Sequence, residues 1–160
     1  MDNDIPEGFE PASIGGHFAG RNGPLHARWL DGHLLVGFRV GPQHVNPMNA
    51  CHGGMLAMVA DILLSTAAHY QTALGRRFLP TISLQIDYLA GAKLGDWVEG
   101  RADILRTTRN LLFSQGLLSV DGTPVLRASG VFKIGPPTPL DKDDAGLRLP
   151  GMPVTVQAAQ

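Results

Sequence analysis

The longest apolar stretch of the chain covers residues 53–74, which are rich in Ala, Leu and Met. These residue types are strong helix formers, so the stretch predicts one long helix. Its larger apolar side chains occur nearly all the way round that helix: Met55, Leu56, Met58, Val59, Ile62, Leu63 and Leu64. A helix that is apolar on every side is typical of a protein interior. We therefore expect a long buried helix over residues 53–74, followed by Gly75, a residue type that commonly comes after the last helical turn.

Strand patterns lie on both sides of this helix. Residues 33–40 predict one strand before it. After it, residues 81–88 alternate apolar Ile, Leu, Ile and Tyr with polar Thr, Ser, Gln and Asp, which is a period of two. Further strands are predicted at residues 97–106, 111–120 and 125–134, and Asp121-Gly122 is a strong hairpin signal between the last two. The prediction is an α+β fold, a long central helix wrapped by a curved antiparallel sheet of about five to six strands.

The two ends of the chain differ from this middle part. Residues 1–23 contain many Gly and Pro residues and have no period, so we expect a flexible N-terminal arm. Residues 136–160 form a Pro-rich and polar tail, which includes the charged run at residues 141–144. The 160 residues thus predict a single folded domain at residues 24–135.

Composition and charge exclude several classes of function. The net charge is −1, so no basic surface indicates nucleic-acid binding. A single Cys excludes a disulfide framework and a Cys-rich zinc site, and the six His residues lack metal-ligand spacing. No apolar run approaches the roughly 20 residues of a membrane span, and the acidic N-terminus is unlike a signal peptide. We expect a cytoplasmic protein that needs no metal or cofactor.

The loop that enters the long helix carries the first candidate chemistry. It ends in Gly53 and Gly54, and glycine allows a ligand to approach the backbone closely. The first amides of a helix lack internal partners and suit an anion or a developing oxyanion. The alternative is that both glycines only permit a tight turn into the helix.

Asp61 is the second candidate, because it lies in the most apolar part of the helix. A buried carboxylate is costly unless it is paired or used, so Asp61 is either a satisfied core group or a general base in a cleft. It follows Gly53 by eight residues, which is about 12 Å along a helix. Both cannot act on one carbonyl within one chain. If both act, the site combines two subunits of a dimer with antiparallel helices.

Other polar side chains carry weaker signals. Asp61, Ser65 and His69 share one helix stripe, but no strained turn exposes the serine, so a catalytic triad is not expected. Cys51 is expected to be a small buried or loop thiol. Several basic residues could bind phosphates or could simply be solvated strand ends; Lys93 and the pair Arg109-Asn110 are the preferred candidates.

Several of these motifs together resemble a known family. Asn46, His52-Gly53-Gly54, Asp61, Thr81-Ile82-Ser83-Leu84 and Ala92-Lys93-Leu94-Gly95-Asp96 are similar to the PaaI-like acyl-CoA thioesterases of the hotdog fold. The resemblance covers about residues 33–134. It implies the hotdog fold, an acyl-CoA substrate, and a homodimer that often pairs into a dimer of dimers.

The resemblance also implies roles for single residues. The Gly53 amide would bind the thioester carbonyl, with Gly54 beside it and Asn46 holding the carbonyl or the water. His52 would lie beside the sulfur or support the loop. Asp61 of the partner subunit would activate water, and Thr81 would assist the same water.

Two alternatives remain open at this point. One is an enoyl-CoA hydratase or dehydratase on the same fold, which typically uses a His with an acidic residue. The other is a non-catalytic acyl-CoA-binding or sensing protein, although residues 1–32 lack a helix-turn-helix pattern. Fold alone does not choose among them, and the sequence leaves the acyl group open.

Overall fold

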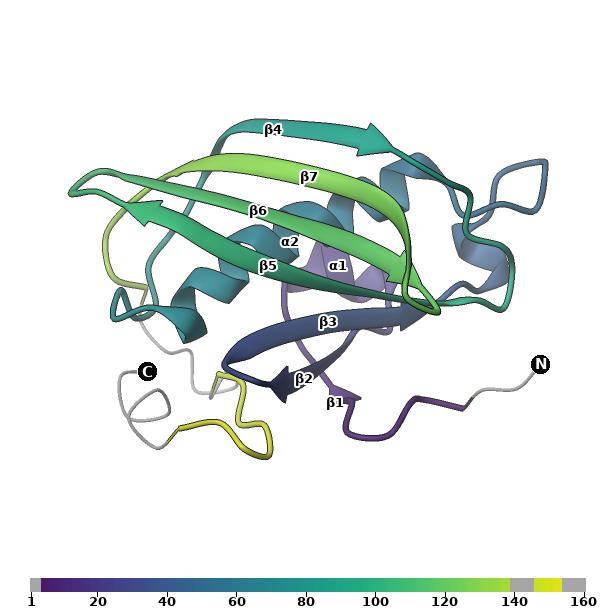
Figure 1. Cartoon of the computed structure of the whole chain (residues 1–160), viewed down its shortest axis with the longest axis horizontal. Coiled ribbons are helices and arrows are strands. Elements are labelled where there is room, and N and C mark those ends of the chain that lie inside the picture. The colour runs from purple at the N-terminus through teal and green to yellow at the C-terminus, as the bar shows by residue number, and fades with distance from the viewer. Residues whose placement is uncertain (1–3, 139–145, 154–160) are drawn as a thin grey trace.

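The computed structural model describes residues 4–138 and 146–153. Seven strands form one antiparallel sheet in the order β1-β2-β3-β5-β6-β7-β4, and Figure 1 shows this sheet curving around helix α2. The elements are β1 (Glu10–Pro11), α1 (Gly16–Asn22), β2 (His26–Leu30), β3 (His33–Arg39), the 3-10 turn η1 (Pro42–His44), α2 (Gly53–Gln71), β4 (Thr81–Tyr88), β5 (Trp97–Thr107), β6 (Leu111–Val120) and β7 (Thr123–Lys133). The predicted α+β architecture, with one long helix and a curved antiparallel sheet, is confirmed.

The predicted number of strands is too low, because β1 and β2 precede the first expected strand. A tight turn at Asp31-Gly32 joins β2 to β3, and both residues have a positive φ, 50° and 78°. Asp121-Gly122 joins β6 to β7 in the same way, with φ values of 48° and 78°. Two central residues with positive φ match the twist of a hairpin. The same dipeptide therefore marks two hairpins, of which only the second was predicted.

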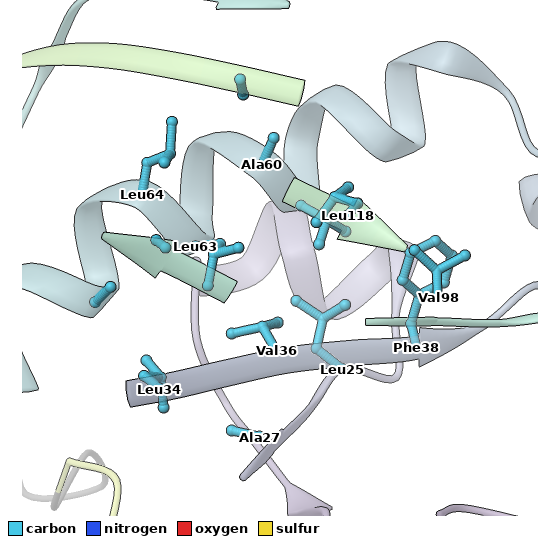
Figure 2. Close-up of a cluster of buried hydrophobic side chains, with 14 of the residues drawn as sticks. Leu25, Ala27, Leu34, Val36, Phe38, Ala60, Leu63, Leu64, Val98 and Leu118 are labelled. Atoms are coloured by element: carbon cyan, nitrogen blue, oxygen red, sulfur yellow. The ribbon is translucent and has the colours of Figure 1, made fainter. Parts of the chain in front are cut away.

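The core forms where α2 lies against the sheet. Figure 2 shows Leu63 and Leu64 of α2 in a cluster that also contains Leu34 and Val36 of β3 and Leu118 of β6, all of them fully or almost fully buried. Burial of an aliphatic side chain of this size contributes roughly 1.5–3 kcal/mol relative to an exposed one. Packing against the strands, rather than helix propensity alone, therefore holds α2 in place.

Two expectations for the helix need correction. It ends at Gln71 rather than near Gly75, because the Thr72 hydroxyl donates to the Ala68 carbonyl (2.7 Å) and accepts from the Leu74 amide (3.2 Å). Such side-chain bonds compete with the next helical turn. The burial is also incomplete: a stripe that includes Asp61 and Ile62 is only half-buried in the isolated chain.

Both ends of the chain add to the central unit. Helix α1 lies within residues 1–23, where no element was expected. Beyond residue 135, Leu147, Leu149 and Met152 are buried in the main hydrophobic cluster, and the Leu147 amide donates to the Tyr70 hydroxyl (2.8 Å). The charged run at residues 141–144 lies outside the described residues. The domain limits of 24–135 stay a prediction. In the described part of the chain, no helix is long and apolar enough to cross a membrane.

Candidate active site

The loop before α2 is held in one shape by its own hydrogen bonds. Asn46 Oδ1 accepts from the amides of Met48 (2.9 Å) and Ala50 (3.2 Å), so this side chain closes the turn. The Leu94 amide donates to the Asn49 carbonyl (3.2 Å), which ties the turn to the next loop. Asn46 is therefore positioned by the turn that its own oxygen closes, while its amide nitrogen has no acceptor among the described residues.

His52 caps the N-terminus of α2. Its Nδ1 accepts a hydrogen bond of 2.9 Å from the Gly54 amide, and the ring is exposed. The cap satisfies one of the amides that a helix start leaves without a partner. Because Nδ1 is the acceptor, the neutral ring carries its proton on Nε2. Gly54 is thus engaged through its amide in holding the helix start.

The Gly53 amide behaves differently, since it has no hydrogen-bond acceptor among the described residues. The residue is covered from the side by Tyr88, whose hydroxyl donates to the Gly53 carbonyl (2.9 Å). A Cβ at Gly53 would lie 3.1 Å from ring atoms of Tyr88, so the glycine also allows this close contact. Tyr88 was missed as a site residue because it reads as the last apolar position of a strand.

Asp61 and Thr81 meet at a second place on the helix. The Thr81 hydroxyl donates to Asp61 Oδ1 at 2.7 Å. This contact depends on a β-bulge: Thr81 pairs with Phe132 and Ser83 with Val131, so Ile82 is the extra residue. Phe132 is fully buried, and Thr81 shares its side of the sheet. The regular alternation of residues 81–88 is therefore interrupted at Ile82, and Thr81 faces the helix.

The expected site residues fall into two groups at opposite parts of α2. One group surrounds the helix start and includes Lys93, which forms an isolated bridge with Ala50. The other surrounds Asp61. Asn110 belongs to the second end of the sheet, because its carbonyl accepts from the Ile134 amide (2.8 Å), next to the bond from Lys133 to Pro80 (3.0 Å).

Strand β4 spans the two groups. Its first residue contacts Asp61 and its last contacts Gly53, so β4 runs antiparallel to α2. The distance from Gly53 to Asp61 is that of eight helical residues, about 12 Å along the axis. A single chain therefore does not bring the free amide and the carboxylate to one reacting atom.

No other nucleophile or metal cluster is assembled in the part of the chain that the structure describes. Ser65 Oγ donates to the backbone carbonyls of Asp61 (3.0 Å) and Ile62 (3.2 Å), so it has no contact typical of a triad. Cys51 is buried as expected, and burial raises the pKa of its thiol to about 11. Within residues 4–138 and 146–153, no three His, Cys, Asp or Glu side chains are grouped to hold a metal ion.

Comparison with known proteins agrees with this architecture. The sequence profile of the thioesterase superfamily matches residues 48–124. The chain is 31% identical over 97 residues to mouse acyl-coenzyme A thioesterase 13, covering 61% of this chain and 68% of the relative. It is 28% identical over 131 residues to the protein PA0474 of Pseudomonas aeruginosa, provisionally named an esterase, covering 81% and 97%.

A solved structure supports the fold independently. A mutant of the phenylacetic acid degradation protein PaaI from Thermus thermophilus superposes with a TM-score of 0.65 at 22% identity, over 74% of this chain and 99% of that one. The long helix in a curved antiparallel sheet is therefore the hotdog fold. By sequence and by fold, this chain belongs to the thioesterase superfamily.

Proposed function

We propose that the chain hydrolyses an acyl-CoA thioester to a free acid and coenzyme A, at a site shared between two subunits. Family membership supports thioester hydrolysis in general. The name of the mouse relative supports coenzyme A as the carrier. The observation that carries the shared site is the separation of the free Gly53 amide from Asp61 on one helix.

The first half-site polarises the carbonyl. The Gly53 amide points outward at the positive end of α2, where a developing oxyanion is stabilised. The Asn46 amide nitrogen adds a second donor, and its position is fixed by the two bonds to its oxygen. His52 acts by holding the helix start, with its Nε2–H directed away from the cap. Loss of one oxyanion donor typically costs about 3–4 kcal/mol of transition-state stabilisation.

The second half-site activates water. Thr81 engages Oδ1 of Asp61, which orients the carboxylate and leaves Oδ2 to accept a proton. Water attacks the carbonyl carbon while Asp61 takes its proton. The tetrahedral intermediate then collapses, the carbon–sulfur bond breaks, and the proton passes from Asp61 to the sulfur. A positioned general base accelerates such a step by about 10²–10⁴-fold.

A two-fold axis between antiparallel helices would unite these halves. The midpoint between Gly53 and Asp61 is Ala57, and the midpoint of β4 lies between Leu84 and Gln85, so one axis can relate both elements. β4 pairs only with β7 and leaves its other edge open among the described strands. An open edge of eight residues is a ready surface for pairing with a second copy. The homodimer thus explains both the open edge and the split site; a dimer of dimers would add a second interface.

The remaining candidates fit the same assembly. Lys93 stands at the helix start of one subunit, while Arg109 and Asn110 stand at the end of the sheet near Thr81. In the dimer the two ends come together, and these exposed residues would contact the phosphates of coenzyme A. Gly54 keeps the surface open for the pantetheine arm.

The experiment is hydrolysis of a panel of alkyl and aryl acyl-CoAs, followed as release of free thiol. The proposal is supported if at least one thioester is hydrolysed and this hydrolysis depends on Asp61. Hydration of an enoyl-CoA without thiol release would identify a hydratase instead. Binding of acyl-CoA without any reaction would identify a sensor.

A further inference from the structure

The peptide group between Gly53 and Gly54 is held at both of its ends. Its N–H, on Gly54, donates to His52 Nδ1 (2.9 Å), and its carbonyl, on Gly53, accepts from the Tyr88 hydroxyl (2.9 Å). The two side chains come from different parts of the chain, since His52 precedes α2 and Tyr88 is the last residue of β4. This peptide is therefore fixed by two side chains in addition to the helix itself.

The free amide of Gly53 belongs to the preceding peptide, between His52 and Gly53. The His52 carbonyl accepts from the amides of Met55 (2.9 Å) and Leu56 (3.3 Å), so it points along α2. In a trans peptide the N–H points opposite to the carbonyl. The Gly53 N–H therefore points away from the helix, towards the place where an oxyanion would bind.

Two successive glycines would leave this helix start loosely defined if nothing else held it. Glycine has more backbone freedom than any other residue, and the first amides of a helix lack the partners that fix later turns. A displacement of 1 Å at a reacting group can cost about 10²-fold in rate. A donor built on Gly53 therefore needs support from outside the helix.

Tyr88 supplies that support without belonging to the core. Its side chain is 55% exposed, and the hydrophobic clusters formed by the described residues do not include it. Its ring instead covers Gly53, where an added Cβ would lie 3.1 Å from the ring atoms. A large side chain that contacts a helix start in this way contributes more to local order than to global stability.

We propose that Tyr88 is a positioning residue for the Gly53 amide: together with His52 it holds the Gly53–Gly54 peptide, and so keeps the preceding N–H in one direction. This inference rests on the proposed function, because it assigns a further residue to that reaction. At the other end of β4, Thr81 contacts Asp61. One strand would then orient both the oxyanion donor and the general base.

The first test is the kinetics of Tyr88→Phe, which keeps the ring and removes the hydroxyl. We expect kcat to fall by about tenfold, the effect of one hydrogen bond of ordinary strength, with KM within about twofold and an unchanged Tm. Ser129→Ala is the matched control, since it removes a hydroxyl from an exposed position on the neighbouring strand β7. It should leave kcat and KM unchanged.

The second test needs neither substrate nor turnover. Backbone ¹⁵N relaxation of the full-length protein should give the Gly53 amide an order parameter near 0.85, typical of rigid backbone, which falls towards 0.6 in Tyr88→Phe. Ser129→Ala should keep the wild-type value.

A double variant tests whether Tyr88 and His52 act on the same peptide. If they do, His52→Ala combined with Tyr88→Phe should lower kcat by about as much as the more harmful single substitution. A loss equal to the product of the two single losses would overturn the inference, because the side chains would then act separately.

An unchanged kcat in Tyr88→Phe, or an unchanged order parameter at Gly53, would also overturn it. A fall in kcat accompanied by a fall in Tm would do the same, since the tyrosine would then act through general stability. If Tyr88→Phe loosens the Gly53 amide while the wild-type protein hydrolyses no acyl-CoA, the proposed function fails and the hold of Tyr88 on the peptide stands.

Discussion

The Thr81 hydroxyl donates a hydrogen bond of 2.7 Å to Oδ1 of Asp61, linking the first residue of β4 to the middle of α2. The bond exists because the bulge at Ile82 turns Thr81 towards the helix. In a regularly alternating strand of the same sequence, Thr81 would lie on the same face as Ser83, away from the carboxylate. A local irregularity of the edge strand thus orients the proposed general base.

Replacement of Thr81 tests this orientation. Thr81→Val keeps the shape but removes the donor, and a hydrogen bond to a charged group is worth about 1.5–3 kcal/mol. We expect kcat to fall by roughly 10- to 100-fold, with little change in Tm because the side chain is exposed. Thr81→Ser restores the hydroxyl and should recover most of the activity. Equal activity of the Val and Ser variants would contradict a positioning role.

Two substitutions at the helix cap His52 distinguish a structural role of this residue from a catalytic one. His52→Ala should lower the free energy of unfolding by about 1 kcal/mol, the usual cost of a lost helix cap. His52→Asn supplies a new acceptor for the Gly54 amide and should restore stability in urea unfolding. If His52 acts only through the helix start, the Asn variant also regains activity. A stable but inactive Asn variant would show that the imidazole contacts the substrate.

The open edge of β4 predicts which substitution prevents dimerisation. Ile82 is 59% exposed at the bulge of β4, and Leu105 is 57% exposed at a bulge of β5. Ile82→Asp should dissociate the dimer in analytical ultracentrifugation and abolish shared-site activity, because a carboxylate would be buried at the interface. Leu105→Asp introduces the same charge away from β4 and should remain active. A fully active, dimeric Ile82→Asp protein would place the interface elsewhere.

One buried and one half-buried histidine, His26 and His69, predict a loss of stability in acid. Burial lowers the pKa of His26 and of His69 from the ordinary value of 6.5. The unfolded chain therefore binds protons that the folded chain excludes, so stability is retained above pH 6.5 and falls below it. Each histidine that stays neutral in the folded chain lowers the free energy of unfolding by up to about 1.4 kcal/mol per pH unit below its ordinary pKa. His69→Gln, which can still donate to the Arg77 carbonyl, should reduce the slope between pH 6.5 and about 5 in urea unfolding; an unchanged slope would contradict the assignment.

Much of the fold could be predicted because its signals are local. The apolar run of α2, the alternation of β4 and the Asp121-Gly122 hairpin each depend on a few neighbouring residues. Asp31-Gly32 carried the same signal, but the short β2 beside it has only two buried residues in a row before its more exposed end. The end of α2 could not be read from Gly75, because a threonine side chain stopped the helix earlier.

The site was harder to predict, because its contacts join distant segments. The helix start and Asp61 follow from residue types and spacing along one element. Tyr88 has no such signal, since its bond to Gly53 bridges 35 residues. The side of the sheet on which Thr81 lies depends on a bulge. One extra residue in a strand moves every residue before it to the opposite face.

The shared site is tested most directly by mixing two inactive subunits. Asp61→Asn and Asn46→Ala chains, each carrying a different affinity tag, are co-expressed and the mixed dimers are purified through both tags. If Asn46 of one subunit acts with Asp61 of the other, each mixed dimer contains one intact site and should recover about half of the wild-type activity. If both residues act within one chain, every site in the mixed dimer carries a defect. Mixed dimers as inactive as their parents would contradict the shared site.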